Sequence, residues 1–230
     1  QMDDKFYYPK KDLRPIEWKN YEELKFSVET DTITALILKP LAKSKATIFY
    51  FHGAGGNITH YLPLTLILVK NDFQVVMVDF RGYGKSTGTP THNNISSDGQ
   101  KIFEMLLERH GIKKTAKIIY GISIGTQIAT RLAKNNQEKI NGLVLEGTIS
   151  SFTDIAMFYT PQYKEYLEKN YISPYSAKED IKSIDKIPKI FIHSKEDKQV
   201  PYLQSEIVFN NAPEPKEFLE FTGEHLQALK

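Results

Sequence analysis

Short apolar runs alternate with segments of helical spacing along most of this chain, and no other feature limits the possible folds as strongly. Runs such as TIFYF, VVMV, LVL and IFI have the length and composition of strands that are buried on both faces. The alternation predicts an α/β fold, with a mostly parallel central sheet flanked by helices. Strands are predicted at 32–39, 46–51, 74–80, 117–122, 140–146, 189–193 and 217–221, and helices at 62–69, 95–109, 124–133 and 203–209.

The segment from about 149 to 187 interrupts this rhythm. It is rich in Tyr, Lys and Glu, contains Pro161 and Pro174, and is too long for a simple loop. We therefore expect a small cap insertion above the sheet. A chain of 230 residues is otherwise the length of one domain, so residues 1–230 are predicted to form a single domain with this cap.

Composition excludes several classes of function. A formal net charge of +2 gives no basic excess for nucleic acid, and the absence of cysteine rules out a thiolate nucleophile and a zinc–cysteine site. No apolar run is long enough to span a bilayer. The chain begins with Gln1-Met2, so the possibility of an upstream signal or membrane anchor is kept. Such a segment would allow the protein to associate with a membrane. The localisation is left open between cytoplasmic and exported or membrane-anchored.

The motif Gly-Ile-Ser-Ile-Gly stands where a predicted strand turns into a predicted helix. A nucleophile on such a sharp turn is exposed above the sheet, and the crowded backbone requires small residues beside it, here Gly121 and Gly125. The following helix directs its free N–H groups toward the same place, which favours a developing anion. Ser123 is therefore the predicted nucleophile.

A serine nucleophile needs a base and an acid that orients the base. His225, in GEH after the last predicted strand, and Asp197, in HSKEDKQVP, follow Ser123 in the order Ser, acid, His that this architecture uses. Glu196 and Glu146 are the alternative acids. The other histidines are interpreted as structural or exposed: His52, His60, His92, His110 and His193. Of these, His52 is expected to shape the backbone of a glycine-rich loop, and His193 to pack or cap at a strand end.

The glycine-rich segment FHGAGGN lets backbone approach a substrate closely after a strand. The N–H groups of Ala54 and Ile124 are the predicted oxyanion donors, with Gly55 as the alternative. The segment is not a dinucleotide-binding fingerprint, because Ile58 occupies the position of the third glycine that this motif requires. The later segment GYGKS is not a nucleotide-binding P-loop, because Asp79 occupies the position of the first glycine of that motif. No cofactor and no metal are predicted, and Arg81 is expected to brace neighbouring backbone.

Five motifs in order, FHGAGGN, DFRGYGKSTGTP, GISIG, HSKEDKQVP and GEH, resemble the α/β-hydrolase superfamily from about Ala46 to His225. They are similar to its short-capped serine hydrolase branch, with abhydrolase-domain, depalmitoylase-like and prolyl-oligopeptidase-like relatives. The resemblance implies the α/β-hydrolase fold and the same roles for Ser123, His225, Asp197, Ala54 and Ile124. KFYYP also resembles a segment that follows an N-terminal membrane anchor in such proteins.

The predicted activity is hydrolysis of carboxylic esters or thioesters through an acyl-enzyme, on small-molecule substrates with short or medium acyl groups. Aromatic residues of the cap, Phe152, Phe158 and Tyr159, are the tentative substrate wall, although the same stripe could pack the cap onto the body. A serine peptidase of prolyl-oligopeptidase-like type and a non-catalytic binding module with a hydrolase fold are the alternatives.

Overall fold

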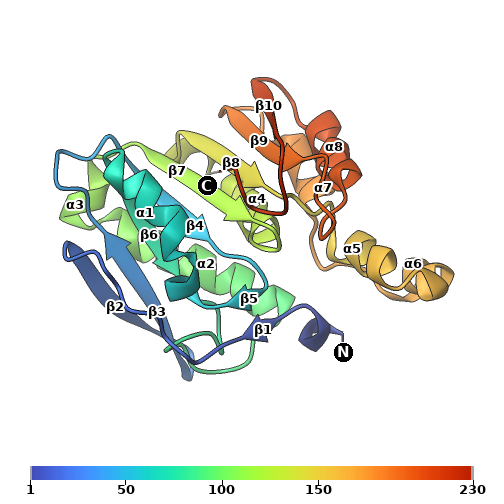
Figure 1. Cartoon of the computed structure of the whole chain (residues 1–230), viewed down its shortest axis with the longest axis horizontal. Helices are drawn as coiled ribbons and strands as arrows, with labels where there is room; N and C mark the ends of the chain where they lie inside the picture. Colours follow the sequence, from blue (N-terminus) through green and yellow to red (C-terminus); the bar gives the residue numbers. More distant parts are fainter. Residues whose placement is uncertain (1, 229–230) are drawn as a thin grey trace. The chain divides into compact units, whose positions relative to one another are not determined.

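The computed structural model describes residues 2–228, which divide after Tyr120 into two compact units (Figure 1). Strand β7 (Lys117–Ile122) crosses this boundary. Each unit is built of strands with helices packed on them. The single domain predicted from the length of the chain stays a prediction.

The first unit carries the strand order β4-β6-β3-β2. Strand β4 (Ala46–Phe51) runs parallel to β6 (Phe73–Val78), with Phe49 opposite Val76, and β3 (Asp31–Leu38) runs antiparallel to β6. Every residue of β4 is buried, as its continuous apolar run predicts. The helices of this unit are α1 (Leu62–Lys70), α2 (His92–Leu107) and α3 (His110–Lys113).

Two features of the first unit are absent from the sequence predictions. Strand β2 (Tyr21–Val28) pairs antiparallel with β3, and its outward face is exposed at alternate positions. The two-residue strands β1 (Tyr8–Pro9) and β5 (Gly55–Gly56) pair in parallel, with the Tyr8 N–H donating to the Ala54 carbonyl at 2.9 Å. The N-terminal segment is thus bonded to the glycine-rich loop after β4.

The second unit places β8 (Gly142–Glu146), β9 (Lys189–Ser194) and β10 (Lys216–Phe221) side by side, all parallel. Its helices α4 (Gly125–Asn135), α7 (Ala177–Asp180) and α8 (Tyr202–Asn211) pack together (Figure 1). Because parallel strands end at the same edge, the loops after β8, β9 and β10 meet there. Every predicted strand and helix of the two units has a counterpart in the structure.

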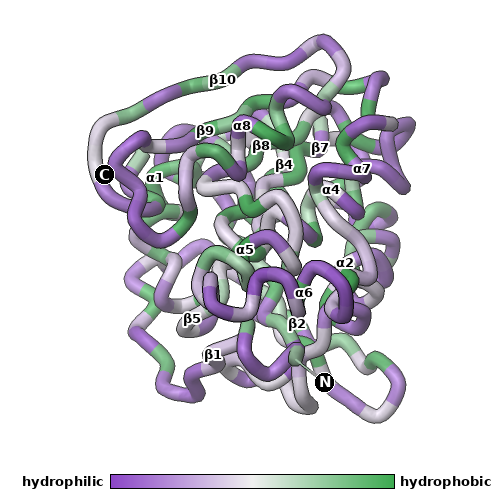
Figure 2. The backbone as a smooth tube through the Cα atoms, turned by 90° about the vertical axis from the view of Figure 1, so that its right-hand side faces the viewer, coloured by the Kyte–Doolittle hydropathy of each residue, from purple (hydrophilic) through white to green (hydrophobic). Residues whose placement is uncertain are grey.

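The predicted cap insertion separates into two parts. Helices α5 (Phe152–Tyr159) and α6 (Lys164–Asn170) pack on each other and lie apart from the strands of their unit in Figure 1, whereas α7 packs on α4 and α8. Figure 2 shows α5 as mostly hydrophobic and α6 as mostly hydrophilic. The projecting cap is therefore the α5–α6 pair.

Short 3-10 turns stand at Asp3–Lys5, Ile58–Tyr61, Gln137–Lys139, Pro161–Tyr163 and Ile181–Ser183. Among residues 2–228, no helix combines the length and the apolar character needed to cross a membrane.

Candidate active site

Ser123 occupies a strained turn between β7, which ends at Ile122, and α4, which begins at Gly125. Its φ of 51° lies in the left-handed region, which a residue with a side chain rarely adopts. The turn is held from both sides, because the Ser123 N–H donates to the Glu146 carbonyl at 2.9 Å and Thr126 Oγ1 donates to the Ser123 carbonyl at 2.6 Å. This geometry is the strand-turn-helix context in which a nucleophilic serine is displayed.

Gly121 shows why the turn requires a glycine before the serine. A Cβ atom at this position would lie 2.5 Å from the Gly125 carbonyl oxygen and 2.6 Å from the Ala129 Cβ. The start of α4 therefore packs directly on the Gly121 backbone. Ile124 caps that helix, and the first N–H groups of a helix lack partners within it, so an anion beside Ser123 would face N–H donors.

His225 and Asp197 are joined by a hydrogen bond within the second unit. His225 Nδ1 lies 2.5 Å from Asp197 Oδ2, and both side chains are almost fully buried. The carboxylate can only accept, so Nδ1 carries the proton and Nε2 keeps its lone pair for a substrate-side proton. The hydrogen-bond partner of His225 is Asp197, whereas the neighbouring Glu196 is exposed.

Asp197 is kept ionised despite its burial. Burial alone would raise the pKa of its carboxyl, but hydrogen bonds from His193 and His225 and from the Val200 N–H hold that pKa well below its usual range. Asp197 Oδ1 accepts from the N–H groups of Gln199 and Val200, both at 2.9 Å. The acid loop, residues 195–201, is thus folded around this carboxylate.

Gly147, which the sequence interpretation passed over, fixes the place of the His225 ring. It follows Glu146, the residue whose carbonyl accepts the Ser123 N–H, and its φ is 59°. A Cβ atom there would lie 2.7 Å from His225 Cε1 and 3.1 Å from Nδ1. The imidazole therefore lies against the end of β8, next to the residue that holds the Ser123 backbone.

A second missed residue is His193, which was expected only to pack or cap. Its Nε2 lies 3.2 Å from Asp197 Oδ2, the same oxygen that meets His225. The available signal was its spacing, four residues before Asp197 on the strand that leads to the acid.

The predicted oxyanion loop lies in the first unit and is held by His52. His52 Nδ1 donates to the Gly53 carbonyl at 2.7 Å, which fixes the Gly53–Ala54 peptide plane and with it the direction of the Ala54 N–H. Burial lowers the pKa of His52 to about 4, although the bond to Gly53 acts in the opposite direction. His52 therefore shapes backbone as a neutral ring, as expected. The role of Ala54 as an oxyanion donor stays a prediction.

The three tentative substrate residues of the cap differ in exposure. Phe152 is fully buried, with its ring edge-on to Tyr175 at 5.4 Å between centroids, so it packs the start of α5 into its unit. Phe158 and Tyr159 are 44% and 61% exposed. Tyr159 also donates its hydroxyl to the Gln199 carbonyl at 2.7 Å, which ties the cap to the acid loop.

Arg81 differs from its expected role, because it binds carboxylates rather than backbone. Its guanidinium bonds Asp98 at 2.7 Å, Asp31 at 2.9 Å and Glu29 at 3.0 Å. The planar five-donor group of arginine suits such a multiple partnership. Ion pairs thus brace the segment DFRGYGKSTGTP in addition to its backbone hydrogen bonds, and one of them joins Lys85 to Glu23 at 2.6 Å.

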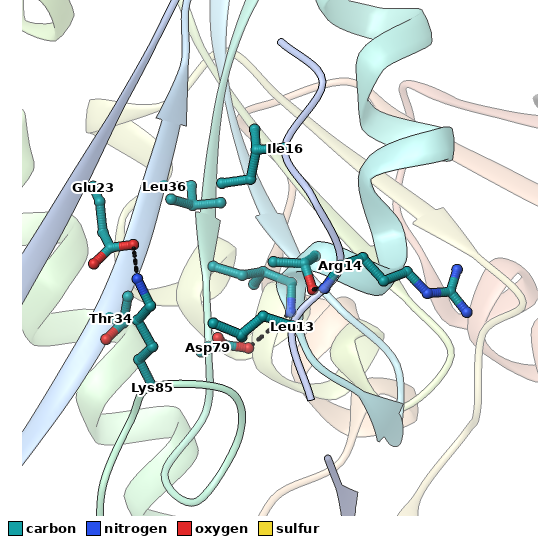
Figure 3. Close-up of a pocket in the computed structure, with 10 residues that line it drawn as sticks. Leu13, Arg14, Ile16, Glu23, Thr34, Leu36, Asp79 and Lys85 are labelled. Atoms are coloured by element: carbon teal, nitrogen blue, oxygen red, sulfur yellow. Dashed lines mark hydrogen bonds and ion pairs between the residues drawn. The ribbon is translucent and has the colours of Figure 1, made fainter. Parts of the chain in front are cut away.

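The first unit also contains a small cavity of about 50 Å³ beneath residues 13–16 (Figure 3). Leu13, Ile16 and Leu36 surround it, and the buried Asp79 carboxyl contributes a polar group. A volume of this size accommodates a few water molecules and is too small for an acyl substrate. Burial raises the pKa of Asp79 to about 7, although the Ile58 N–H and Lys11 act in the opposite direction.

Comparisons with known proteins identify the family. Residues 42–171 match the family model described as serine aminopeptidase, S33. Protein bem46 of Schizosaccharomyces pombe is 33% identical over 73% of this chain, which spans only 56% of that protein's length. The uncharacterized protein YfhR of Escherichia coli K12 is 31% identical, over 97% of this chain and 80% of the length of YfhR.

Solved structures confirm the fold. The esterase Pf2001 of Pyrococcus furiosus superposes with a TM-score of 0.75 at 17% identity, over 96% of this chain and 91% of that one. At this identity the likeness speaks for the fold alone. The predicted fold class is confirmed, and the chain belongs to the α/β-hydrolase superfamily of hydrolases and esterases.

Proposed function

We propose that this protein is a serine hydrolase that cleaves carboxylic esters or thioesters with Ser123 as nucleophile, His225 as base and Asp197 as orienting acid. The single observation that carries the proposal is the 2.5 Å contact between His225 Nδ1 and Asp197 Oδ2. This contact leaves His225 Nε2 as the basic nitrogen. Ser123 stands on the strained turn, and its N–H donates to the Glu146 carbonyl at the end of β8, next to Gly147, against which the imidazole lies.

The proposed reaction has two steps. Ser123 Oγ attacks the acyl carbon while its proton passes to His225 Nε2, and Nε2 then gives that proton to the departing alcohol or thiol as its bond to the acyl carbon breaks. A water molecule next attacks the acyl-enzyme and passes a proton to Nε2, which returns it to Ser123 Oγ as the acid leaves. Asp197 keeps its charge throughout and stabilises the imidazolium.

The negative oxygen of each tetrahedral intermediate requires N–H donors that are already oriented. The N–H of Ile124 at the start of α4 is one proposed donor, and Ala54 in the His52-braced loop is the other. Each such donor typically contributes a factor of about 10² to 10³ in kcat.

For the substrate we propose a small molecule with a short or medium acyl group. The exposed Phe158 and Tyr159 of α5 supply apolar surface, and Tyr159 connects that surface to the acid loop. The buried Phe152 takes no part in this proposal.

A serine peptidase is the second candidate, because the matching family is described as a serine aminopeptidase. The same triad would then attack an amide carbon, and His225 would protonate an amine instead of an alcohol.

Hydrolysis of p-nitrophenyl esters from acetate to palmitate tests the proposal, with aminoacyl p-nitroanilides run in parallel. Ser123→Ala is compared with wild type, and Ser97→Ala, a change to an exposed serine of α2, is the matched control. We expect kcat/KM for the preferred ester to fall at least about 10³-fold in the Ser123 variant only. A fluorophosphonate should label wild type and not this variant. Turnover of the anilides alone would favour the peptidase, and a folded but inert and unlabelled wild type would refute both.

A further inference from the structure

His193 is fully buried near the end of β9, where it contacts two residues of the acid loop and two of α8. Its Nε2 lies 3.2 Å from Asp197 Oδ2 and 2.9 Å from the Val200 carbonyl oxygen. Its Nδ1 lies 2.6 Å from Ser205 Oγ on α8, and the Tyr202 ring stands edge-on to it at 5.7 Å between centroids. A histidine with this many polar contacts does more than fill space.

These contacts determine where the protons of His193 lie. Both neighbours of Nε2, a carboxylate oxygen and a carbonyl oxygen, can only accept, so Nε2 carries a proton. Nδ1 then accepts from the Ser205 hydroxyl, which can rotate to donate. In this arrangement both ring nitrogens are satisfied and the ring acts as a donor toward Asp197.

The carboxylate of Asp197 is consequently held at both oxygens. Oδ1 accepts from two backbone N–H groups of the acid loop, and Oδ2 accepts from His225 and lies 3.2 Å from His193 Nε2, whose N–H is shared with the Val200 carbonyl oxygen. We infer that His193 is a positioning residue for the proposed hydrolase: its Nε2–H fixes the plane of the Asp197 carboxylate and shares the charge of the oxygen that binds His225. This inference rests on the function proposed above for Ser123, His225 and Asp197.

Two substitutions separate this role from packing. His193→Gln keeps an amide donor at the reach of Nε2 and so can still meet Asp197, whereas His193→Asn reaches only as far as Nδ1 and can meet only Ser205. Ser205→Ala is the control, because it removes the hydrogen bond on the far side of the ring and leaves Nε2 with its two acceptors.

Steady-state kinetics as a function of pH supply the first readout. In His193→Asn we expect kcat to fall about 10-fold with KM little changed, because the loss corresponds to one hydrogen bond to a charged group. Without the His193 donor, more negative charge remains on Asp197 Oδ2 and favours protonated His225, so the acidic limb of kcat/KM moves to higher pH. His193→Gln should recover most of kcat and the wild-type profile, and Ser205→Ala should leave the profile in place.

Proton NMR supplies a second readout that needs no substrate, the low-field signal of the Nδ1 proton shared by His225 and Asp197. It should move or broaden in His193→Asn and stay in place in Ser205→Ala. If the Asn and Gln variants share one profile and one signal with the control, His193 only packs and the inference is overturned. An inert wild type would refute the proposed hydrolase, while the NMR comparison would still decide whether His193 positions Asp197.

Discussion

His225 Nδ1 lies 2.5 Å from Asp197 Oδ2 because two loops that follow adjacent parallel strands meet at one edge of the second unit. Asp197 follows β9, and His225 follows β10, its neighbour. The pairing of these strands in register brings Ser194 opposite Phe221, so each loop starts from the same level. This hydrogen bond is thus a consequence of strand pairing, and its chemistry can be tested one residue at a time.

Asp197→Asn should lower kcat about 10³- to 10⁴-fold with little change in KM. An amide in place of the carboxylate stabilises the imidazolium poorly and allows His225 to adopt the wrong tautomer. Single-turnover and steady-state hydrolysis of the preferred p-nitrophenyl ester measure this effect. Glu196→Gln, which changes the exposed neighbour, is the control and should stay within about 2-fold of wild type, since it leaves the pair intact. Equal losses in the two variants would argue against Asp197 as the orienting acid.

Gly147→Ala should reduce kcat by about 10²-fold or more through displacement of His225. The added Cβ would lie 2.7 Å from His225 Cε1, and the φ of 59° disfavours any side chain. Gly142→Ala, at the start of the strand that Gly147 follows, is the matched control, because its Cβ would come no closer than 3.7 Å to the Pro188 carbonyl oxygen. Kinetics and the unfolding midpoint of both variants should be compared. Full activity in the Gly147 variant would show that the imidazole does not need this position.

The sequence predicted the strands and helices well because their apolar runs are continuous and lie where both faces are buried, as in β4. It missed β2, where Glu23 and Lys25 alternate with half-buried residues and dilute the apolar signal. The candidate triad was predictable because its members follow a motif order. Gly147 was not, because its constraint comes from the His225 ring, which approaches only through tertiary structure. The donor role of His193 likewise depends on how the acid loop turns back onto β9.

Tyr159→Phe should lower kcat a few-fold, in the range of about 2- to 10-fold, with a small effect on stability. The change removes the 2.7 Å hydrogen bond to the Gln199 carbonyl, and Gln199 in turn donates its N–H to Asp197. Tyr163→Phe provides the control, since Tyr163 is a similarly exposed cap tyrosine. Kinetics on a short and a long ester would compare the two. An equal response to both changes would show that the cap does not act on the acid loop through Tyr159.

Asp79→Asn should change how the stability of the protein depends on pH. The pKa of Asp79 is raised by burial from 3.8 to about 7, so between these values the folded protein holds a proton that the unfolded chain has lost. The contribution of Asp79 to stability is therefore full below about pH 4, falls as the pH rises, and levels off above about pH 7. The full loss amounts to at most about 4 kcal/mol.

An asparagine keeps an oxygen for the Ile58 N–H, which donates to Asp79 at 2.8 Å, but it cannot ionise. Denaturant unfolding at pH 5 and pH 8 should therefore show the variant gaining about 2 to 3 kcal/mol relative to wild type across this interval. His52, with its pKa lowered to about 4 by burial, changes stability in the opposite sense, and because its Nε2 lies 3.7 Å from Asp79 Oδ1 the measured difference reports Asp79 together with its effect on His52. Asp4→Asn, at an exposed carboxylate, is the control and should show no such gain. A constant difference between wild type and the Asp79 variant at both pH values would mean that Asp79 is already ionised in the folded protein at pH 5.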